Sequence, residues 1–159
     1  MSIAKQITDF IYGTQRVRRR YEAQNPDERV VAADASKGTR GGEDTVVRRG
    51  LNWVASQRAV ILLTDKRIVC GKWDIPLDTI IGAQLLRVKT LLGSAHVLKI
   101  ATNEQSFFQF GMQRNDEWDD QEVLPLTVSQ GRLRYSPFSL VVRIALIGYL
   151  VYRLILRFV

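Results

Sequence analysis

The residues that could support acid, base or metal chemistry are few and scattered. His96 is the single histidine and Cys70 the single cysteine, so neither a histidine-based metal site nor a serine-histidine-aspartate relay has its parts in this chain. We predict that His96 is a strand-edge residue and that Cys70 is a small buried apolar residue. A disulfide framework is excluded, and the compartment is expected to be reducing.

Two polar stretches match binding motifs only in part. The stretch KGTRGGED (37–44) lacks the Gly-Lys-Ser/Thr ending with which a phosphate loop reaches phosphate and metal. The stretch NDEWDDQE (115–122) offers carboxylates for an acid pair or a cation site, but it lacks the spacing and the glycine of an EF-hand loop. We interpret 35–44 as a flexible loop and 115–122 as a solvated helix face. We therefore predict no catalytic residue, no metal and no cofactor.

The positive charge of the chain lies at its two ends. The formal net charge is +7, but residues 28–122 carry 13 basic and 13 acidic side chains. Residues 1–27 carry five and three, and residues 123–159 carry five and none. A nucleic-acid-binding domain would normally place a basic stripe on its own folded surface. We therefore predict no nucleic-acid partner.

Apolar residues recur at helical spacing near the N-terminus, at Ile3, Ile7, Phe10, Ile11, Val17 and Tyr21. This pattern predicts an amphipathic helix within residues 1–25. Its last turns carry four candidate binding residues, Arg16, Arg18, Arg19 and Arg20. They form either a solvated basic face on a packed helix, which we prefer, or a contact with anionic lipid headgroups.

From residue 28 onward the period changes to short strand-like runs bounded by turn residues, which is typical of an antiparallel sheet. The runs are ERVVAAD, TVVRRG, AVILLT, RIVCGKW, IIGAQLLRV, HVLKIAT and SFFQFG. The tetrapeptide TDKR between two of them is predicted to be a hairpin turn, with Asp65 able to bond the local backbone. Trp53, Trp73 and Trp118 are expected to pack in the core or at its rim.

The order of these segments resembles the pleckstrin-homology-like superfamily, in particular its bacterial PH-like and GRAM-type members. The resemblance is carried by VILLTDKRIVC (60–70), IPLDTIIGAQLL (75–86), VLKIAT (97–102), FFQFG (107–111) and Trp118. It implies a mainly β fold with flanking helices, in which a strongly bent, seven-stranded antiparallel sheet is closed at one corner by a C-terminal helix. It also implies binding of lipids or proteins rather than catalysis. The expected long closing helix is here short and acidic, so VLPLTV (123–128) or the N-terminal helix is expected to share that role.

In lipid-binding PH domains the first loop and second strand hold cations that grip phosphates. The corresponding segment here offers Lys37, Arg40, Arg48 and Arg49. Adjacent residues of a strand point to opposite faces, so at most one of Arg48 and Arg49 can line such a pocket. Ordinary surface charge is the alternative interpretation, and we prefer it.

The segment 137–159 is mostly Leu, Val and Ile, interrupted by Arg143, Arg153 and Arg157. Its last 22 residues would form a helix of about 33 Å, enough to cross a hydrocarbon core of about 30 Å. With the helix centred on Gly148, Arg143 and Arg153 lie about 7 Å from the midplane, and their side chains can reach the interfaces. The three arginines share one side of the helix.

This polar stripe has two interpretations. The helix lies in the headgroup region with the stripe in water, or it spans the membrane and the stripe faces a protein partner. We favour spanning, because IALIGYLVY is more apolar than an interfacial helix should be. The N-terminus lacks the apolar region of a signal peptide. We therefore expect a single-pass tail anchor with the folded part on the cytoplasmic side.

The chain is thus predicted to comprise an N-terminal amphipathic helix (1–25), a PH-like domain (28–122), a linker (123–136) and a transmembrane helix (137–159). The predicted function is a non-enzymatic accessory or scaffolding subunit of a larger membrane protein complex. Its partners would be membrane lipids and other membrane protein subunits. The alternative is a PH-like sensor of anionic lipid at the cytoplasmic membrane surface, with Lys37, Arg40 and the RVRRR run reading headgroups.

Overall fold

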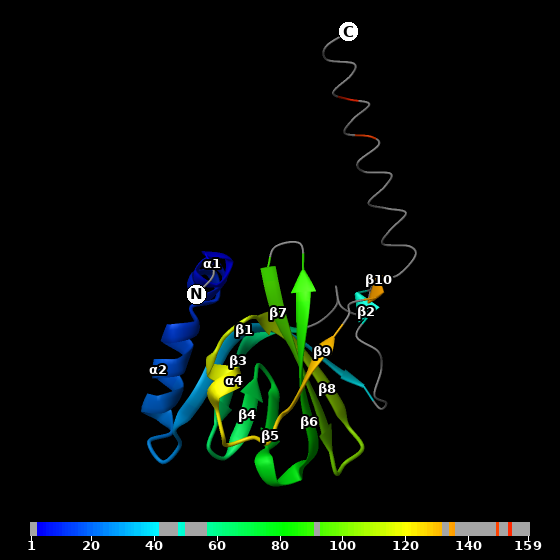
Figure 1. The fold of residues 1–159 in the computed structure, drawn as a ribbon. Coiled ribbons are helices and arrows are strands. Elements are labelled where there is room, and N and C mark those ends of the chain that lie inside the picture. Colours follow the sequence, from blue (N-terminus) through cyan, green and yellow to red (C-terminus); the bar gives the residue numbers. More distant parts are fainter. Residues whose placement is uncertain are drawn as a thin grey trace.

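The computed structural model describes residues 3–41, 48–49, 57–90, 93–131, 134–135, 149 and 153. The helices are α1 (Ile3–Tyr12), α2 (Thr14–Gln24), the 3-10 turn η1 (Leu77–Thr79) and α4 (Glu117–Asp120). The strands are β1 (Val30–Gly41), β2 (Arg48–Arg49), β3 (Gln57–Thr64), β4 (Arg67–Cys70), β5 (Trp73–Pro76), β6 (Ile80–Thr90), β7 (Gly93–Thr102), β8 (Phe107–Gln113), β9 (Thr127–Gly131) and β10 (Arg134–Tyr135). The predicted mainly β fold with few helices is confirmed (Figure 1).

Eight of these strands form one sheet in the order β5-β4-β3-β1-β8-β7-β6-β9. Two antiparallel meanders, β3-β4-β5 and β6-β7-β8, are joined by β1, which pairs with β3 on one side and β8 on the other. The eighth strand, β9, is added parallel to β6. The sheet curves around its core but does not close, because β5 and β9 end it on opposite sides.

The first strand is longer than predicted, because β1 continues to Gly41 and so includes most of the segment predicted to be a loop. Gly38 shows why the composition was misleading. A Cβ atom at this position would collide with the Trp73 ring and lie 2.9 Å from Phe110 Cδ1. The glycine is therefore needed for close packing inside a strand rather than for a turn, and the loop prediction is wrong for residues 35–41.

The main core lies on the inner face of the curved sheet. Its completely buried members include Ile61, Leu63, Leu98 and Phe110, and two rings beside them, Trp73 and Phe108, meet edge to face at 5.8 Å. Cys70 is 0% exposed in this cluster, as predicted. Burial raises the pKa of its thiol, which keeps it protonated and unreactive.

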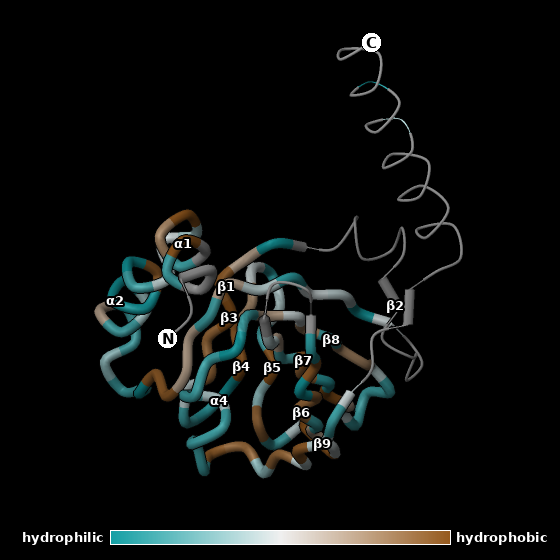
Figure 2. The backbone as a smooth tube through the Cα atoms, turned by 45° about the horizontal axis from the view of Figure 1, so that its top comes forward, coloured by the Kyte–Doolittle hydropathy of each residue, from teal (hydrophilic) through white to brown (hydrophobic). Residues whose placement is uncertain are grey.

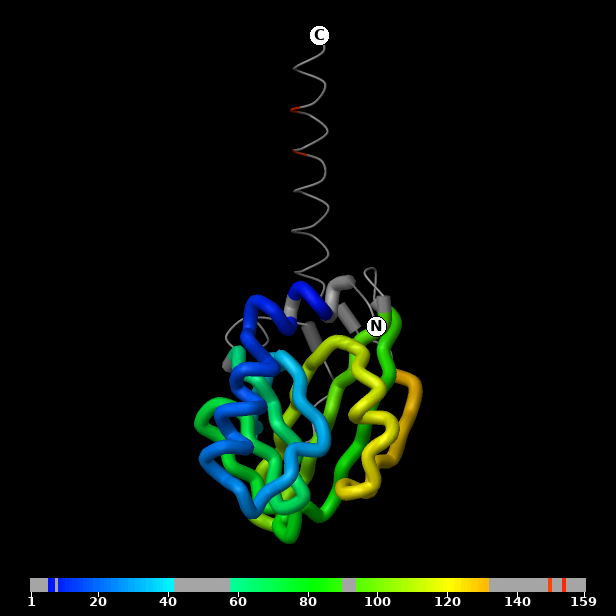
Figure 3. The backbone as a smooth tube through the Cα atoms, turned by 90° about the vertical axis from the view of Figure 1, so that its left-hand side faces the viewer, coloured from blue at the N-terminus to red at the C-terminus, as the bar shows by residue number. Residues whose placement is uncertain are grey.

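The N-terminal amphipathic segment forms two helices rather than one. Gly13 separates α1 from α2 with a left-handed φ of 61°, a conformation that glycine adopts without strain. Tyr12 and Tyr21 pack against a second apolar cluster on the outer face of β1 and β3, which consists of Val30, Ala33, Val60 and Leu62. Figure 3 shows α2 running along the side of the sheet and α1 turning across its end.

The β3–β4 hairpin turn is confirmed, but Thr64 rather than Asp65 makes the local bonds. The Thr64 hydroxyl accepts the N–H groups of Lys66 and Arg67 and donates to the Arg67 carbonyl. Asp65 instead accepts the N–H of Arg29, a residue that precedes β1. The turn therefore also ties β3 to the start of the sheet.

The folded sheet extends beyond residue 122 into the segment predicted to be a linker. Leu124 is 3% exposed in the main core, and β9 pairs with β6 from Gln84↔Thr127 to Val88↔Gly131. As expected, VLPLTV therefore shares in covering the core, because its apolar residues complete the face left open by the short α4.

The predicted membrane anchor lies almost wholly outside the described residues. Within 137–159 only Tyr149 and Arg153 are described, both with helical backbone and exposed side chains; Arg143 and Arg157 are not among them. None of the helices in the described part of the chain combines the length and apolar composition that crossing a membrane requires. The transmembrane helix stays a prediction.

Candidate functional site

The structure divides the basic run of α2 into two groups. Arg16, Arg19 and Arg20 are exposed, whereas Arg18 is half-buried and turns toward the sheet. The Arg18 side chain is 22% exposed. The four arginines predicted as one candidate surface therefore have separate roles, and only three of them face solvent.

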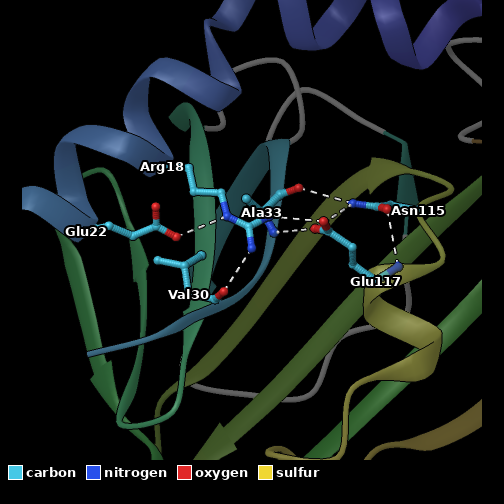
Figure 4. A network of polar contacts seen from close by, with 6 residues as sticks. All are labelled: Arg18, Glu22, Val30, Ala33, Asn115 and Glu117. Atoms are coloured by element: carbon cyan, nitrogen blue, oxygen red, sulfur yellow. Dashed lines mark hydrogen bonds and ion pairs between the residues drawn. The ribbon is translucent and has the colours of Figure 1, made fainter. Parts of the chain in front are cut away.

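Arg18 is the centre of a polar network that joins α2, β1 and α4 (Figure 4). Its guanidinium donates to Glu117 Oε1 at 3.0 Å, to the Val30 carbonyl at 2.9 Å and to Glu22 Oε1 at 3.3 Å. The other Glu117 oxygen accepts the Ala33 N–H at 3.1 Å, and Asn115 Nδ2 donates to the Ala33 carbonyl at 3.1 Å. Side chains thus satisfy a stretch of β1 backbone that β8 does not reach.

The short helix α4 is held at three consecutive residues. Glu117 takes part in the Arg18 network, Trp118 is 0% exposed in the main core, and Asp119 accepts two hydrogen bonds from Arg87 of β6. Glu117 and Asp119 are therefore structural partners of arginines. The prediction of a solvated acidic face is wrong for these two residues and holds for the exposed Asp120.

Lys37 and Arg40 do not form a joint phosphate pocket. They lie three positions apart on β1, so their side chains leave opposite faces of the sheet. Arg40 Nη2 donates to Ser106 Oγ at 2.8 Å, and its guanidinium lies 5.4 Å from the centre of the Phe108 ring. This cation-π contact holds Arg40 at the sheet surface. Arg48 and Arg49 form β2, and the structure describes their backbone but not their side chains.

His96 is buried in the middle of the sheet and not at a strand edge. It pairs with Arg87 of β6 and Met112 of β8 on its two sides, and it is 1% exposed. Its Nε2 lies 3.6 Å from Asp119 Oδ2, and neither ring nitrogen has a hydrogen-bond partner among the described residues. Burial lowers the pKa of the ring, while the Asp119 charge opposes that shift. So enclosed a ring cannot meet a substrate in solution.

The neutral state of His96 predicts a pH-dependent stability. The charges of Asp119 and Asp116 raise the pKa of the ring, and those of Arg87 and Arg114 lower it. Because the folded pKa lies below the ordinary value of 6.5, unfolding takes up a proton and stability falls as pH drops below about 6.5. The slope from this residue reaches at most about 1.4 kcal/mol per pH unit. Urea unfolding across this range should show a smaller slope for His96→Gln; equal slopes would contradict the assignment.

A second ion-pair cluster, which the sequence did not suggest, ties the start of β1 to β4 and β5. Arg67 bonds Glu28 at 3.0 Å and Asp74 at 2.9 Å, and Tyr21 donates to Glu28 at 2.7 Å. Burial and the Glu28 carboxylate raise the pKa of Tyr21 to about 12. The Tyr21 hydrogen bond and the Arg67 charge lower the pKa of Glu28, although burial opposes this. These groups hold α2 on the sheet.

Comparison with protein-family models, with curated proteins and with solved structures finds no match to this chain. Among the described residues, no group of three or more His, Cys, Asp or Glu side chains is arranged to hold a metal ion.

Two surfaces among the described residues are candidates for binding a partner. One is the outer face of α1, where Ile7, Phe10 and Ile11 are exposed. The other is the outer edge of β9, which pairs on one side with β6 and on its other side with no described strand. The helical spacing of apolar residues in the sequence indicates the surface on α1. Nothing in the sequence indicates the edge of β9.

Proposed function

We propose that this chain is a non-enzymatic PH-like docking subunit, held at a membrane by residues 137–159, that joins other subunits of a membrane protein complex. The fold supports the PH-like assignment in part. The seven antiparallel strands are followed directly by a helix, α4, that packs Trp118 into the core. That helix has only four residues, so α2 and β9 supply the remaining cover at the flanks of the sheet.

The observation that carries the docking role is the outer edge of β9, with which no described strand pairs. Strands at sheet edges invite pairing with another chain unless charge, proline or short length protects them. At the opposite edge, β5 is four residues long and carries Asp74 and Pro76. In contrast, β9 has the sequence TVSQG, with neither proline nor charge, and Val128 on it is 44% exposed. A partner strand can therefore extend the sheet here.

The ionisable groups support a binding role over catalysis. Glu117 and Asp119 are engaged by arginines that fasten α4, and Glu28 is engaged by the arginine that fastens β4. Catalytic acids and bases instead gather in a cleft with perturbed pKa values and access to substrate. Among the described residues, Tyr21, Glu28 and Arg67 have shifted pKa values and join α2 to the sheet, whereas the shifted Cys70 and His96 are buried.

A lysine on the β9 edge should therefore break the proposed assembly. We expect Val128→Lys to fold normally, because the side chain is already exposed, and to lose its partner strand through the buried charge it would place in the interface. The full chain would be extracted in mild detergent from its native membranes, and its assembly size measured by native mass spectrometry. The wild-type chain should have the mass of a defined assembly with other subunits, and the variant should have a smaller mass.

Asn103→Lys is the matched control for this experiment. It adds the same charge at an exposed residue of the β7–β8 turn, far from β9, and should leave the assembly intact. Extraction of the wild-type chain as a lone monomer would refute the docking role. An assembly that survives Val128→Lys would show that subunits join at another surface.

A sensor of anionic lipid headgroups is the second candidate function. The three exposed arginines of α2 favour it, whereas the separation of Lys37 and Arg40 on opposite faces of β1 speaks against a headgroup pocket. A sensor should bind a water-soluble headgroup such as glycerophosphate and lose that binding in Arg40→Gln. The docking subunit should show no saturable binding.

A further inference from the structure

Helix α1 presents three large apolar side chains to solvent, while Asp9 and Tyr12 on its other side contact the protein. Ile7 is 56% exposed, Phe10 88% and Ile11 72%. At 100° per residue these three positions fall within an arc of about 100°. A helix that merely covered the sheet would place this arc inward, so the exposed arc calls for an apolar partner outside the described domain.

The opposite side of α1 is fastened to the domain. Asp9 accepts a hydrogen bond from the Thr14 hydroxyl at 3.1 Å, and Thr14 is 1% exposed. Tyr12 packs against the cluster of Val30 and Ala33 on the outer face of the sheet. These contacts set the rotation of the helix about its axis, so the apolar arc cannot turn inward without breaking them. Figure 2 shows the apolar residues of α1 at the margin of the molecule.

This helix lies at the end of the sheet from which the chain leaves toward the predicted anchor. Since β9 is parallel to β6, Gly131 lies beside Val88, near the end of β6. Figures 1 and 3 place α1 across this same end of the sheet, and Figure 1 places β10 there too. From Tyr135, the last residue of β10, the predicted anchor begins two residues later, at most about 7 Å away. An anchored chain would thus bring this end, and α1 with it, to the bilayer.

Positive charge borders the apolar arc. Arg18 points toward the sheet and bonds Glu117 and Val30. Arg16, Arg19 and Arg20 are exposed. No hydrogen bond or ion pair joins the side chains of these three to another described residue. Helix α2 starts beside α1 and descends from this end (Figure 1). Arg20 is six residues from its start, about 9 Å along the axis. All three therefore lie within about one Debye length of the start of α2, where it meets α1.

We propose that α1 is a second membrane contact, lying in the interfacial layer of an anionic bilayer with Ile7, Phe10 and Ile11 among the acyl chains. The arginines of α2 lie at the headgroups. This arrangement of apolar arc and cationic flank is that of an interfacial helix. Together with the anchor it fixes how the domain sits on the membrane, so the inference rests on the proposed membrane location. A second copy of the chain is less suited to this surface, because two such cationic flanks repel each other.

The test places a polarity-sensitive fluorophore at Phe10→Cys of the full chain in vesicles. Cys70 is 0% exposed and will not compete for the label. The control is Asn103→Cys, an exposed site at the far end of β7. In vesicles with anionic lipid, we expect the emission at position 10 to shift to the blue and to be quenched by nitroxide-labelled acyl chains. The label at position 103 should remain in water in every vesicle.

The arginines are tested in the same labelled chain. Each of Arg16→Gln, Arg19→Gln and Arg20→Gln should lower the ratio of docked to undocked α1 by about 5-fold. High salt or zwitterionic lipid should also lower the ratio of docked to undocked α1. Adding Ile11→Asp to the labelled chain should undock the helix without altering the fold, because residue 11 is exposed.

Each outcome assigns its failure to one claim. If the chain resists alkaline carbonate but position 10 stays in water, the inference about α1 is wrong and the proposed anchor stands. If the chain washes off the vesicles, the proposed membrane location itself fails. A blue shift without quenching by nitroxide lipid would mean that protein, such as a second copy, covers the helix, and would also overturn the inference.

Discussion

Replacing Trp118 by alanine should lower the free energy of unfolding by about 3–5 kcal/mol, the range for removal of a large buried aromatic side chain. Trp118 is 0% exposed and belongs to the main core cluster. It is also the only core residue supplied by α4. Its loss leaves a cavity and removes the central contact of that helix. Urea unfolding of the full chain in mild detergent, followed by circular dichroism, would measure the change.

The loss should spread through α4 because its neighbours depend on the same backbone. Glu117 reaches Arg18, and Asp119 reaches Arg87, only while the four-residue helix stays in place. We therefore expect amide hydrogen exchange in Trp118→Ala to rise at Ala33, whose N–H is held by Glu117. The exchange at Cys70, which lies on β4 between β3 and β5, should change less.

Trp118→Phe is the control that separates volume from aromatic character. The indole N–H has no hydrogen-bond partner among the described residues. Phenylalanine is therefore smaller than tryptophan at this position but breaks no hydrogen bond there. It should cost less than half as much as alanine. A loss below about 1 kcal/mol for Trp118→Ala would mean that α4 is not part of the cooperative core.

The sequence predicted most of the central strands, because in them local pattern and tertiary environment agree; the run RIVCGKW is an exception, since a turn at Gly71 and Lys72 divides it between β4 and β5. The strands β3, β4, β7 and β8 each have several apolar residues that are buried. The buried residues of the first hairpin, from Val60 to Cys70, illustrate this. Such agreement between local preference and global fold makes a segment readable from sequence alone.

The sequence predicted the wrong environment for residues whose position is explained by a contact with residues far away in the chain. Gly38 looks like a loop residue until Trp73 and Phe110 are placed against it. The strand β9 looks like a linker until β6 offers it an edge. His96 looks like a strand-edge residue until β6 and β8 enclose it. In each case the decisive contact joins residues far apart in the chain, and single-sequence periodicity carries no such information.

The candidate binding residues were predicted by type but not by direction. The run RVRRR marks a basic helix, yet only the packing of α2 against β1 shows that Arg18 points inward and its three neighbours outward. Likewise the spacing of Ile7, Phe10 and Ile11 predicts an amphipathic helix and says nothing about which side faces the domain. Asp9 and Thr14 decide that. Amphipathicity is a property of the sequence, whereas orientation is a property of the fold.

Arg18→Ala should lower the free energy of unfolding by about 2 kcal/mol, whereas Arg19→Ala should change it by no more than about 0.5 kcal/mol. The first substitution leaves the Val30 carbonyl without its donor and Glu117 without its cation. The second removes an exposed side chain. Both variants lose one positive charge from the same helix, so net charge cannot explain a difference between them. Urea unfolding of the full chain measures it.

The order of the two effects should reverse when membrane docking is measured: Arg19→Ala should then have the larger effect and Arg18→Ala the smaller one. In vesicles with anionic lipid, Arg19→Ala should reduce docking of α1 about 5-fold, while Arg18→Ala, at a urea-free condition where it remains folded, should leave docking close to wild type. Arg18→Lys should recover only part of the stability, because an ammonium group cannot reproduce the fork that reaches Glu117 and Val30 together. Equal losses of stability for Arg18→Ala and Arg19→Ala would show that the network of Figure 4 contributes nothing to the fold. Equal losses of docking would show that headgroups do not distinguish the outward arginines from the inward one.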